Sequence, residues 1–413
     1  MFMIYLDHAA ATPVSERVLQ TMEPYFTERF FNPSAAYLPA KEIAAEYADA
    51  KGRIAHCIGA KAADLVITAG ATEANNLAFT ALSELVFRSG PRPSVPSPRA
   101  DGANPRAAAL RNAPSQNTSS VLYLETEHDS IRKVAEQYGG VAVRVLPSGV
   151  IDLADLREKL SDEVEMISVS LANNELGTIQ PLAEIAGILR EVRMDRMRRG
   201  VRRQLLLHSD ASQALNLLDV NVARLGVDLM TLNAAKVYGP KGVGALYVAH
   251  GVKLSSLALG GGQENGLRSG TENVPGVMGF AVALEIAKAH LNGNRKKYAE
   301  WRKILLSELT GYELINRKHC LDNFVVLCYN GIDAERLIYL LEDRGVYVST
   351  GAACAASKGV KSHVLAAIGL SDAQIAGSLR LTLGEANDEA QIHEAARIIN
   401  EVVATETKRV GAR

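Results

Sequence analysis

The chain has 413 residues, of which 47% are hydrophobic, a length that predicts about two or three domains rather than one small core. Its 45 Lys and Arg balance its 46 Asp and Glu, so neither nucleic acid nor an acidic membrane surface is expected as the main partner. The 4 cysteines are too few for a disulfide scaffold, and no basic segment precedes a long apolar run at the start. We expect a cytoplasmic globular protein without a membrane-spanning segment.

Short β-rich runs alternate with helical patterns from about residue 64 onward. The predicted helices are 74–86, 130–138 and 182–192, and the seven predicted strands are 65–68, 121–125, 141–146, 166–170, 205–207, 229–232 and 244–248. This alternation predicts an α/β fold with a mostly parallel sheet that is covered on both faces. In such a sheet ligands lie beyond the carboxyl ends of the strands.

A second, smaller α+β domain is predicted after this region. Its predicted helices are 304–309, 334–344 and 388–403, and its strands are 323–329 and 346–349. We expect the N-terminal segment to fold back onto it. The large domain is therefore placed at residues 14–265, and the small domain at 1–13 together with 266–413.

Two segments differ from the rest of the chain in composition. Residues 88–118 hold 6 prolines and 5 arginines, which predicts a long loop inserted in the large domain. The run Arg193–Arg203 holds 6 arginines around a single acid, Asp195. A solvated helix end explains this run, and a docking surface is the alternative.

Lys236 lies in the Gly/Pro-rich segment AKVYGPKG at 235–242, between two predicted strands. Burial disfavours the charged form of a lysine, and a neutral amine suits a Schiff base with a carbonyl. Lys236 is therefore a candidate catalytic residue, the alternative being an exposed hairpin lysine.

Polar residues also follow the other predicted strands. Ala71 and Thr72 open a helix, where N–H groups and a hydroxyl form an anion cup suited to phosphate. Asp210 follows strand 205–207, where an acid can keep a pyridine nitrogen protonated. His128 and Asn174 end two further strands. Each is explicable as an ordinary loop-end polar residue, but together they indicate one site.

Cys354 lies in a loop of small residues, STGAACAASKG at 349–359. A thiol without bulky apolar neighbours is exposed and can move, which suits a nucleophile. Cys320 and His319 are adjacent and are not expected to face each other. No Cys/His spacing predicts a zinc site.

Together these motifs resemble those of the cysteine desulfurases, which are pyridoxal-phosphate enzymes of fold type I in the class V aminotransferase group. The resemblance covers nearly the whole chain. The matching segments are YLDHAAATP at 5–13, GATE at 70–73, TEH at 126–128, NNELG at 173–177, DASQ at 210–213, KVYGPKG at 236–242, RSGT at 268–271, the Cys354 loop and SLRLTLG at 378–384.

The resemblance implies pyridoxal 5′-phosphate as the cofactor, held covalently by Lys236. His128 would stack on the cofactor ring and assist proton transfers, and Asp210 would pair with the pyridine nitrogen. The other implied cofactor contacts are Asn174 and Gln213 near the phenolic oxygen, Ala71, Thr72 and Asn233 around the phosphate, and Thr271 from a partner subunit.

The resemblance also implies a substrate and partners. Arg380 would bind the carboxylate of L-cysteine, with Asn174 as a second substrate contact. L-cysteine would become L-alanine, and the Cys354 thiolate would attack the substrate sulfur and carry it as a persulfide. The length of the Cys354 loop implies delivery to a sulfur-acceptor or scaffold protein in iron–sulfur assembly, and Thr271 implies a homodimer.

Two positions depart from the family pattern. The family usually has a serine and a histidine where this chain has Asn233 and Ala235, and both serve the phosphate. Because losing a hydrogen bond to a charged group costs about 1.5–3 kcal/mol, we expect weaker cofactor binding unless Ser212 or a backbone N–H compensates. A selenocysteine lyase-like enzyme and a catalytically weakened regulatory homologue are the alternatives.

Overall fold

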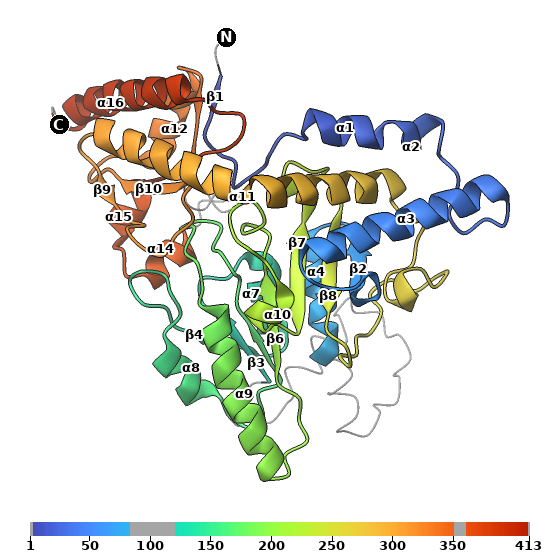
Figure 1. Cartoon of the computed structure of the whole chain (residues 1–413). Coiled ribbons are helices and arrows are strands. Elements are labelled where there is room, and N and C mark those ends of the chain that lie inside the picture. The colour runs from blue at the N-terminus through green and yellow to red at the C-terminus, as the bar shows by residue number, and fades with distance from the viewer. Residues whose placement is uncertain (1–2, 83–119, 351–360, 412–413) are drawn as a thin grey trace, which may run out of the picture.

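The computed structural model describes residues 3–82, 120–350 and 361–411 of the chain (Figure 1). It has the predicted architecture, a large mostly parallel sheet covered by helices and a smaller α+β part. The predicted insertion 88–118 and the predicted nucleophile Cys354 lie outside the described residues.

The large sheet confirms all seven predicted strands within a few residues at their ends. Its strands run in the order β2-β8-β7-β6-β5-β3-β4, and β8 is antiparallel to both of its neighbours while the other adjacent pairs are parallel. The bounds are Leu65–Thr68 for β2, Val121–Leu124 for β3, Val141–Val143 for β4, Met166–Ser168 for β5, Leu206–Asp210 for β6, Leu229–Asn233 for β7 and Gly244–Val248 for β8.

Both faces of the sheet are buried, as its near-continuous apolar strands predict. Along β3, Leu122 and Leu124 belong to one core cluster while Val121 and Tyr123 belong to another on the opposite face. The helices that accompany this sheet are α4 (Ala71–Ala78), α7 (Asp129–Gln137), α8 (Leu153–Lys159), α9 (Leu182–Arg198) and α10 (Val222–Leu225), with the short turns η1 (Ala62–Asp64) and η2 (Ala234–Lys236).

Long helices that the sequence did not predict cover the face nearer the small domain. They are α3 (Leu38–Cys57) and α11 (Val274–Glu308), of which only 304–309 was predicted as helical, and they are joined there by α1 (Glu16–Met22) and α2 (Pro24–Thr27). By length and composition α11 could span a membrane, but 61% of its apolar window is buried inside the protein. It packs on α1, α3 and α16 as a core helix (Figure 1).

The small part is built on an antiparallel sheet in the order β12-β13-β10-β9. The bounds are Ser349–Thr350 for β12, Ser378–Thr382 for β13, Phe324–Cys328 for β10 and Glu313–Leu314 for β9, and the helices are α12 (Ala334–Glu342), α14 (His363–Ala367), α15 (Asp372–Ala376) and α16 (Glu389–Gly411).

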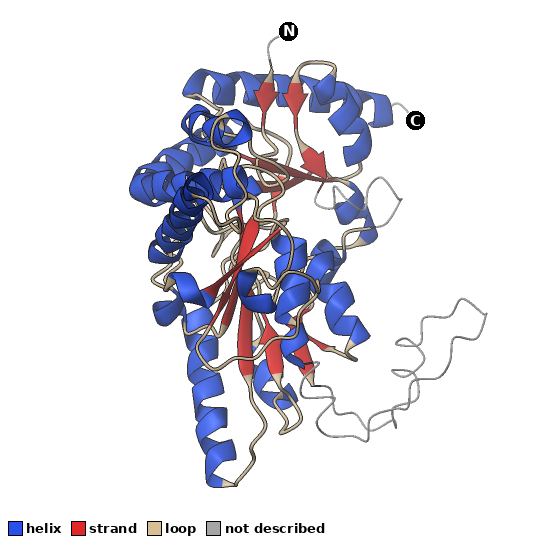
Figure 2. Ribbon diagram, turned by 90° about the vertical axis from the view of Figure 1, so that its right-hand side faces the viewer, coloured by secondary structure: helices blue, strands red, loops and turns tan. Residues whose placement is uncertain are grey.

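The N-terminal segment folds back onto this part, which confirms that expectation. Strand β1 (Ile4–Tyr5) pairs in parallel with β11 (Val346–Tyr347), and both ends of the chain lie at the same end of the molecule (Figure 2). The domain limits themselves stay a prediction, because α11 packs against helices of both parts.

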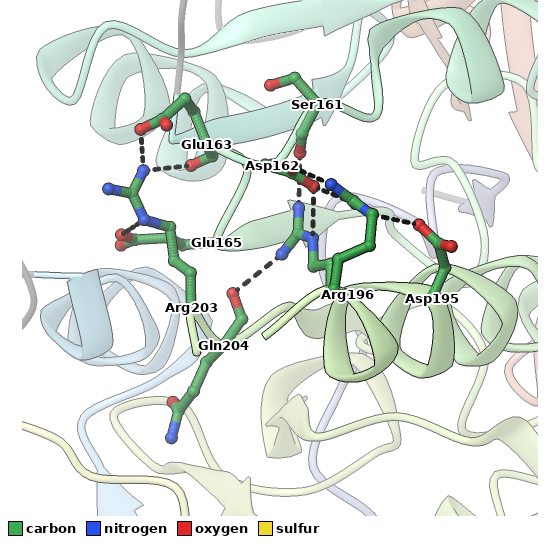
Figure 3. A network of polar contacts seen from close by, with 9 residues as sticks. Ser161, Asp162, Glu163, Glu165, Asp195, Arg196, Arg203 and Gln204 are labelled. Atoms are coloured by element: carbon green, nitrogen blue, oxygen red, sulfur yellow. Dashed lines mark hydrogen bonds and ion pairs between the residues drawn. The ribbon is translucent and has the colours of Figure 1, made fainter. Parts of the chain in front are cut away.

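The arginine run forms the end of α9 and the loop that follows it. Arg196 is buried, donates to the Ser161 and Gln204 carbonyls and lies 3.7 Å from an Asp162 oxygen (Figure 3). Arg203 pairs with Glu163 and Glu165. This internal pairing favours the interpretation of the run as a helix end over that of a docking surface.

Candidate active site

A cavity of about 1120 Å³ lies beyond the carboxyl ends of the parallel strands. Nine of the predicted site residues line it, namely Ala71, Thr72, His128, Asn174, Asp210, Gln213, Asn233, Lys236 and Arg380. Thr271 is exposed and is not among the lining residues, as expected of a residue that would serve a partner's site. The sequence therefore predicted which strand ends converge.

Lys236 ends a single 3₁₀ turn, η2, that directly follows β7. The Asn233 side chain caps this turn by accepting a hydrogen bond from the Ala235 N–H at 3.2 Å. The Lys236 Nζ donates to the Ala9 and Ala10 carbonyls at 2.8 and 2.5 Å. Asn233 thus shapes the turn with its amide oxygen, which leaves its amide nitrogen as the donor that could serve a phosphate.

The carbonyls that hold Lys236 belong to residues 7–12, a segment that turns at 8–10 and that we call the N-terminal strap. The Ala9 carbonyl also accepts from the Gln213 amide at 3.0 Å. The Thr12 hydroxyl donates to the Ala235 carbonyl at 3.1 Å and accepts from the Tyr238 N–H at 2.9 Å. The strap therefore forms part of the cavity wall, a role that sequence reasoning did not assign to it.

Arg380 reaches the cavity from β13 of the small part, although it is only 3% exposed. Its Nη2 lies 2.6 Å from the Asp7 carboxylate and its Nη1 donates to the Asn174 carbonyl at 2.7 Å. Among the described residues no group accepts a hydrogen bond from its Nε. Because Asp7 does not line the cavity, it supports the guanidinium from behind, and the N–H groups that these two contacts leave unused are those that the side chain can offer to an anion.

Asp210 ends β6 and carries two oriented hydrogen bonds. Its Oδ1 accepts from the Ser212 N–H at 2.8 Å, and its Oδ2 accepts from the Asn75 amide at 2.9 Å. The Ser212 hydroxyl lines the cavity and is buried without a hydrogen-bond partner in the described part of the chain. The carboxylate is therefore held in one orientation beside a hydroxyl that a ligand can satisfy.

His128 caps α7, and its Nδ1 accepts a hydrogen bond from the Ser130 N–H at 3.1 Å. The Ser130 hydroxyl lies 2.9 Å from the same nitrogen. Because α7 holds one edge of the ring, the exposed imidazole is fixed against the cavity.

The start of α4 supplies the predicted anion cup. Its N-cap residue, Gly70, has a φ of 142°, and within the described residues no side chain caps the helix. Unpaired N–H groups at a helix start attract an anion such as phosphate. Arg268 donates to Glu73 in the first turn at 2.9 Å, and this ion pair offsets the acid beside the cup.

Two buried carboxyl groups near the cavity were not predicted as site residues. Burial raises the pKa of Glu127 to about 8, although its hydrogen bonds to Ser170 oppose the shift. Burial likewise raises the pKa of Glu175 to about 7, opposed by the Ser362 hydroxyl, which donates to it at 2.5 Å, and by Arg380. Their sequence signal was only their place next to His128 and Asn174.

These residues fit the pyridoxal phosphate that the sequence predicted. An oriented carboxylate suits a pyridine N–H, and the uncapped start of α4 suits a phosphate. A lysine and an aromatic ring face the same cavity, as does the unpartnered Ser212 hydroxyl. Arg380 offers a separate cationic place for a carboxylate.

Comparison with known proteins agrees with this site. The family model for class V aminotransferases matches residues 4–91 and 101–394. A protein of Archaeoglobus fulgidus named cysteine desulfurase IscS 1 is 35% identical over 417 residues, covering 97% of each chain. A solved NifS-like protein superposes with a TM-score of 0.83 at 28% identity, covering 98% of this chain and 100% of its own.

A further solved structure, described as "SspA in complex with cysteine", superposes with a TM-score of 0.74 at 29% identity. The match covers 92% of this chain and 98% of that protein. The family model and the Archaeoglobus relative both span most of the sequence, and the fold and the cavity agree with them. The chain therefore belongs to the class V aminotransferase family.

Proposed function

We propose that the protein is a pyridoxal-phosphate-dependent cysteine desulfurase that converts L-cysteine to L-alanine and transfers the sulfur to Cys354. The observation that carries the proposal is one cavity that brings together Lys236, Asp210, His128 and Arg380. The relatives named cysteine desulfurase, at 31–35% identity over nearly the whole chain, support the choice of reaction.

Different residues of the cavity would bind the cofactor and the substrate. The start of α4 and Asp210 would hold the cofactor at its phosphate and at its ring nitrogen. Arg380 would take the substrate carboxylate with the N–H groups of its guanidinium that Asp7 and the Asn174 carbonyl leave unused. Bound pyridoxal phosphate supplies an electron sink that labilises bonds at the substrate carbons.

The sulfur step needs a nucleophile that the sequence places at Cys354. Its thiolate would attack the substrate sulfur, so that an S–S bond forms as the carbon–sulfur bond breaks. Protonation of the remaining carbon framework then yields L-alanine, and Cys354 is left as a persulfide. His128 and Lys236 are the groups at the cavity that could carry protons in these steps.

The test is an absorption spectrum with added pyridoxal phosphate, followed by L-cysteine and an alanine assay. We expect a near-visible band that shifts on adding L-cysteine while alanine appears. The Lys236→Ala variant should lack the shift, and the Cys354→Ser variant should keep the band but release little alanine. Absence of the band at saturating cofactor would favour the regulatory-homologue alternative instead.

The assay also separates the selenocysteine lyase alternative. A desulfurase should release alanine from L-cysteine and should need Cys354 to do so. Release from L-selenocysteine alone, with full activity in Cys354→Ser, would support a lyase and remove Cys354 from the mechanism. The retained lysine, acid and arginine at one cavity count against a purely regulatory role.

We further propose a homodimer with shared sites, a cytoplasmic location and a sulfur-acceptor or scaffold protein as partner. Thr271 is exposed and away from its own chain's cavity, which supports a role in the partner's site. Mixing Lys236→Ala and Thr271→Ala subunits should restore part of the activity through hybrid dimers that keep one intact site. Failure to restore it under subunit exchange would contradict shared sites.

A further inference from the structure

Asn75 and Ser130 form a buried polar bridge between the two groups predicted to work on the cofactor ring, Asp210 and His128. Asn75 lies in α4 and is fully buried, and its Nδ2 donates to the Asp210 Oδ2 and to the Ser130 Oγ, both at 2.9 Å. Ser130 in turn contacts the His128 Nδ1. Neither Asn75 nor Ser130 was among the predicted site residues.

The contact with Asp210 determines how the Asn75 amide is oriented. An ionised carboxylate only accepts hydrogen bonds, so the Asn75 group that faces Asp210 must be its NH₂. The second hydrogen of that NH₂ goes to the Ser130 Oγ. The Ser130 hydroxyl keeps its own hydrogen and a second lone pair, so it donates to the His128 Nδ1, 2.9 Å away, where that nitrogen is an acceptor.

The Ser130 N–H fixes the tautomer of His128. A backbone N–H can only donate, and the Ser130 N–H points at Nδ1 from 3.1 Å. Nδ1 therefore accepts from both the N–H and the hydroxyl of Ser130. A neutral imidazole whose Nδ1 accepts must carry its hydrogen on Nε2.

We propose that Asn75 and Ser130 are positioning residues for the reaction, which hold Asp210 in place and fix His128 as the tautomer that bears its hydrogen on Nε2. As a neutral ring, His128 then presents an Nε2–H hydrogen-bond donor, and it has no free lone pair with which to act as a base. Simple capping of α7 needs only the Ser130 N–H, whereas the hydroxyl and the Asn75 bridge bring in Asp210 as well. The kinetic part of this inference rests on the proposed function, but the tautomer does not.

The tautomer can be measured directly on the cofactor-loaded protein. Histidine labelled with ¹⁵N gives two-bond proton correlations that distinguish the tautomers, and the His128→Gln variant identifies the signal. We expect neutral His128 to be mainly the Nε2–H form. A dominant Nδ1–H form, or the same mixture as the exposed His250, would overturn the proposal.

Two substitutions at Ser130 test the bridge. Ser130→Ala removes the hydroxyl but keeps the N–H, so the tautomer preference should weaken and kcat should fall about three- to tenfold with little change in KM. Ser130→Thr keeps the hydroxyl and should preserve both. Ser371→Ala, which removes a helix cap in the small part, controls for a general loss of stability.

The outcomes are separable. Unchanged tautomer and kcat in Ser130→Ala, or equal damage in Ser130→Ala and Ser130→Thr, would refute the positioning role. A wild-type protein that binds pyridoxal phosphate but releases no alanine would refute the desulfurase proposal while leaving the tautomer measurement decisive.

Discussion

We predict that removing the Asp7 carboxylate destabilises the folded protein, because Asp7 pairs with the buried Arg380. The Arg380 side chain is 4% exposed and that of Asp7 is 17% exposed, and their charged atoms lie 2.6 Å apart. Asp7→Ala would leave a buried cation without its counter-charge. Breaking such a pair from one side costs about 3–5 kcal/mol, a large share of a typical folding free energy of about 5–15 kcal/mol.

Urea unfolding at equilibrium measures this loss as a lower midpoint with an unchanged slope. Glu191→Ala is the matched control, because the pair of Glu191 with Arg157 is exposed on both sides and should contribute at most about 1 kcal/mol. Asp7→Asn should cost less than Asp7→Ala, because an amide oxygen can still accept from the guanidinium.

A double variant decides whether the charge is the cause. In an Arg380→Met background no buried cation remains, so Asp7→Ala should then cost far less than it does in the wild-type background. An equal cost in both backgrounds would refute the reasoning and assign the loss to the strap itself. The pair should also matter for catalysis, with KM for L-cysteine rising about tenfold or more in Asp7→Asn and kcat changing less.

Three further predictions concern the cofactor, pH and packing. Ala235→His, which restores the usual donor, should tighten pyridoxal phosphate binding about ten- to hundredfold in a fluorescence titration, and an unchanged dissociation constant would contradict the expectation that Ala235 weakens cofactor binding. Burial raises the pKa of Glu127 to about 8, so this carboxyl keeps its proton in the folded state at pH values above about 4.5, where the unfolded state has lost it. The free energy of unfolding should therefore fall as the pH rises from about 5 to 8. Glu127→Gln should flatten that fall in urea titrations, and an unchanged pH profile would refute the assignment. Gly177→Ala should destabilise the protein by about 1–3 kcal/mol or more in the same assay, since Gly177 has a φ of 69° and a Cβ there would lie 2.5 Å from Phe324. A variant as stable as the wild type would contradict this and show that the Phe324 side chain can move aside.

The strand ends were predictable because the residues of each strand, and those on either side of it, are enough to identify the strand. Apolar runs such as Leu229–Leu232 are bounded by polar and glycine residues, and parallel topology then gathers their carboxyl ends. The long helix α11 was mostly missed because its first half is apolar on nearly every side, so the 3.6-residue period that marks a surface helix is absent.

Positioning residues were harder to predict, for a different reason. Asn75 looks like an ordinary polar residue near a helix start, and only the fold brings its amide to Asp210, 135 positions along the chain. Asp7 and Arg380 are 373 positions apart. A local pattern carries no signal of such contacts, so sequence reasoning could name the residues that face the cavity but not those that support them.

The N-terminal strap shows why that distinction matters for this site. On one side the Thr382 hydroxyl of β13 accepts from the Ala9 N–H at 2.9 Å, close to Arg380. On the other side Thr12 binds the turn that carries Lys236. The spacing between Lys236 and Arg380 is therefore set through one short segment that touches both parts of the protein. A change in the strap should disturb both groups together, whereas a change in either sheet alone should disturb one.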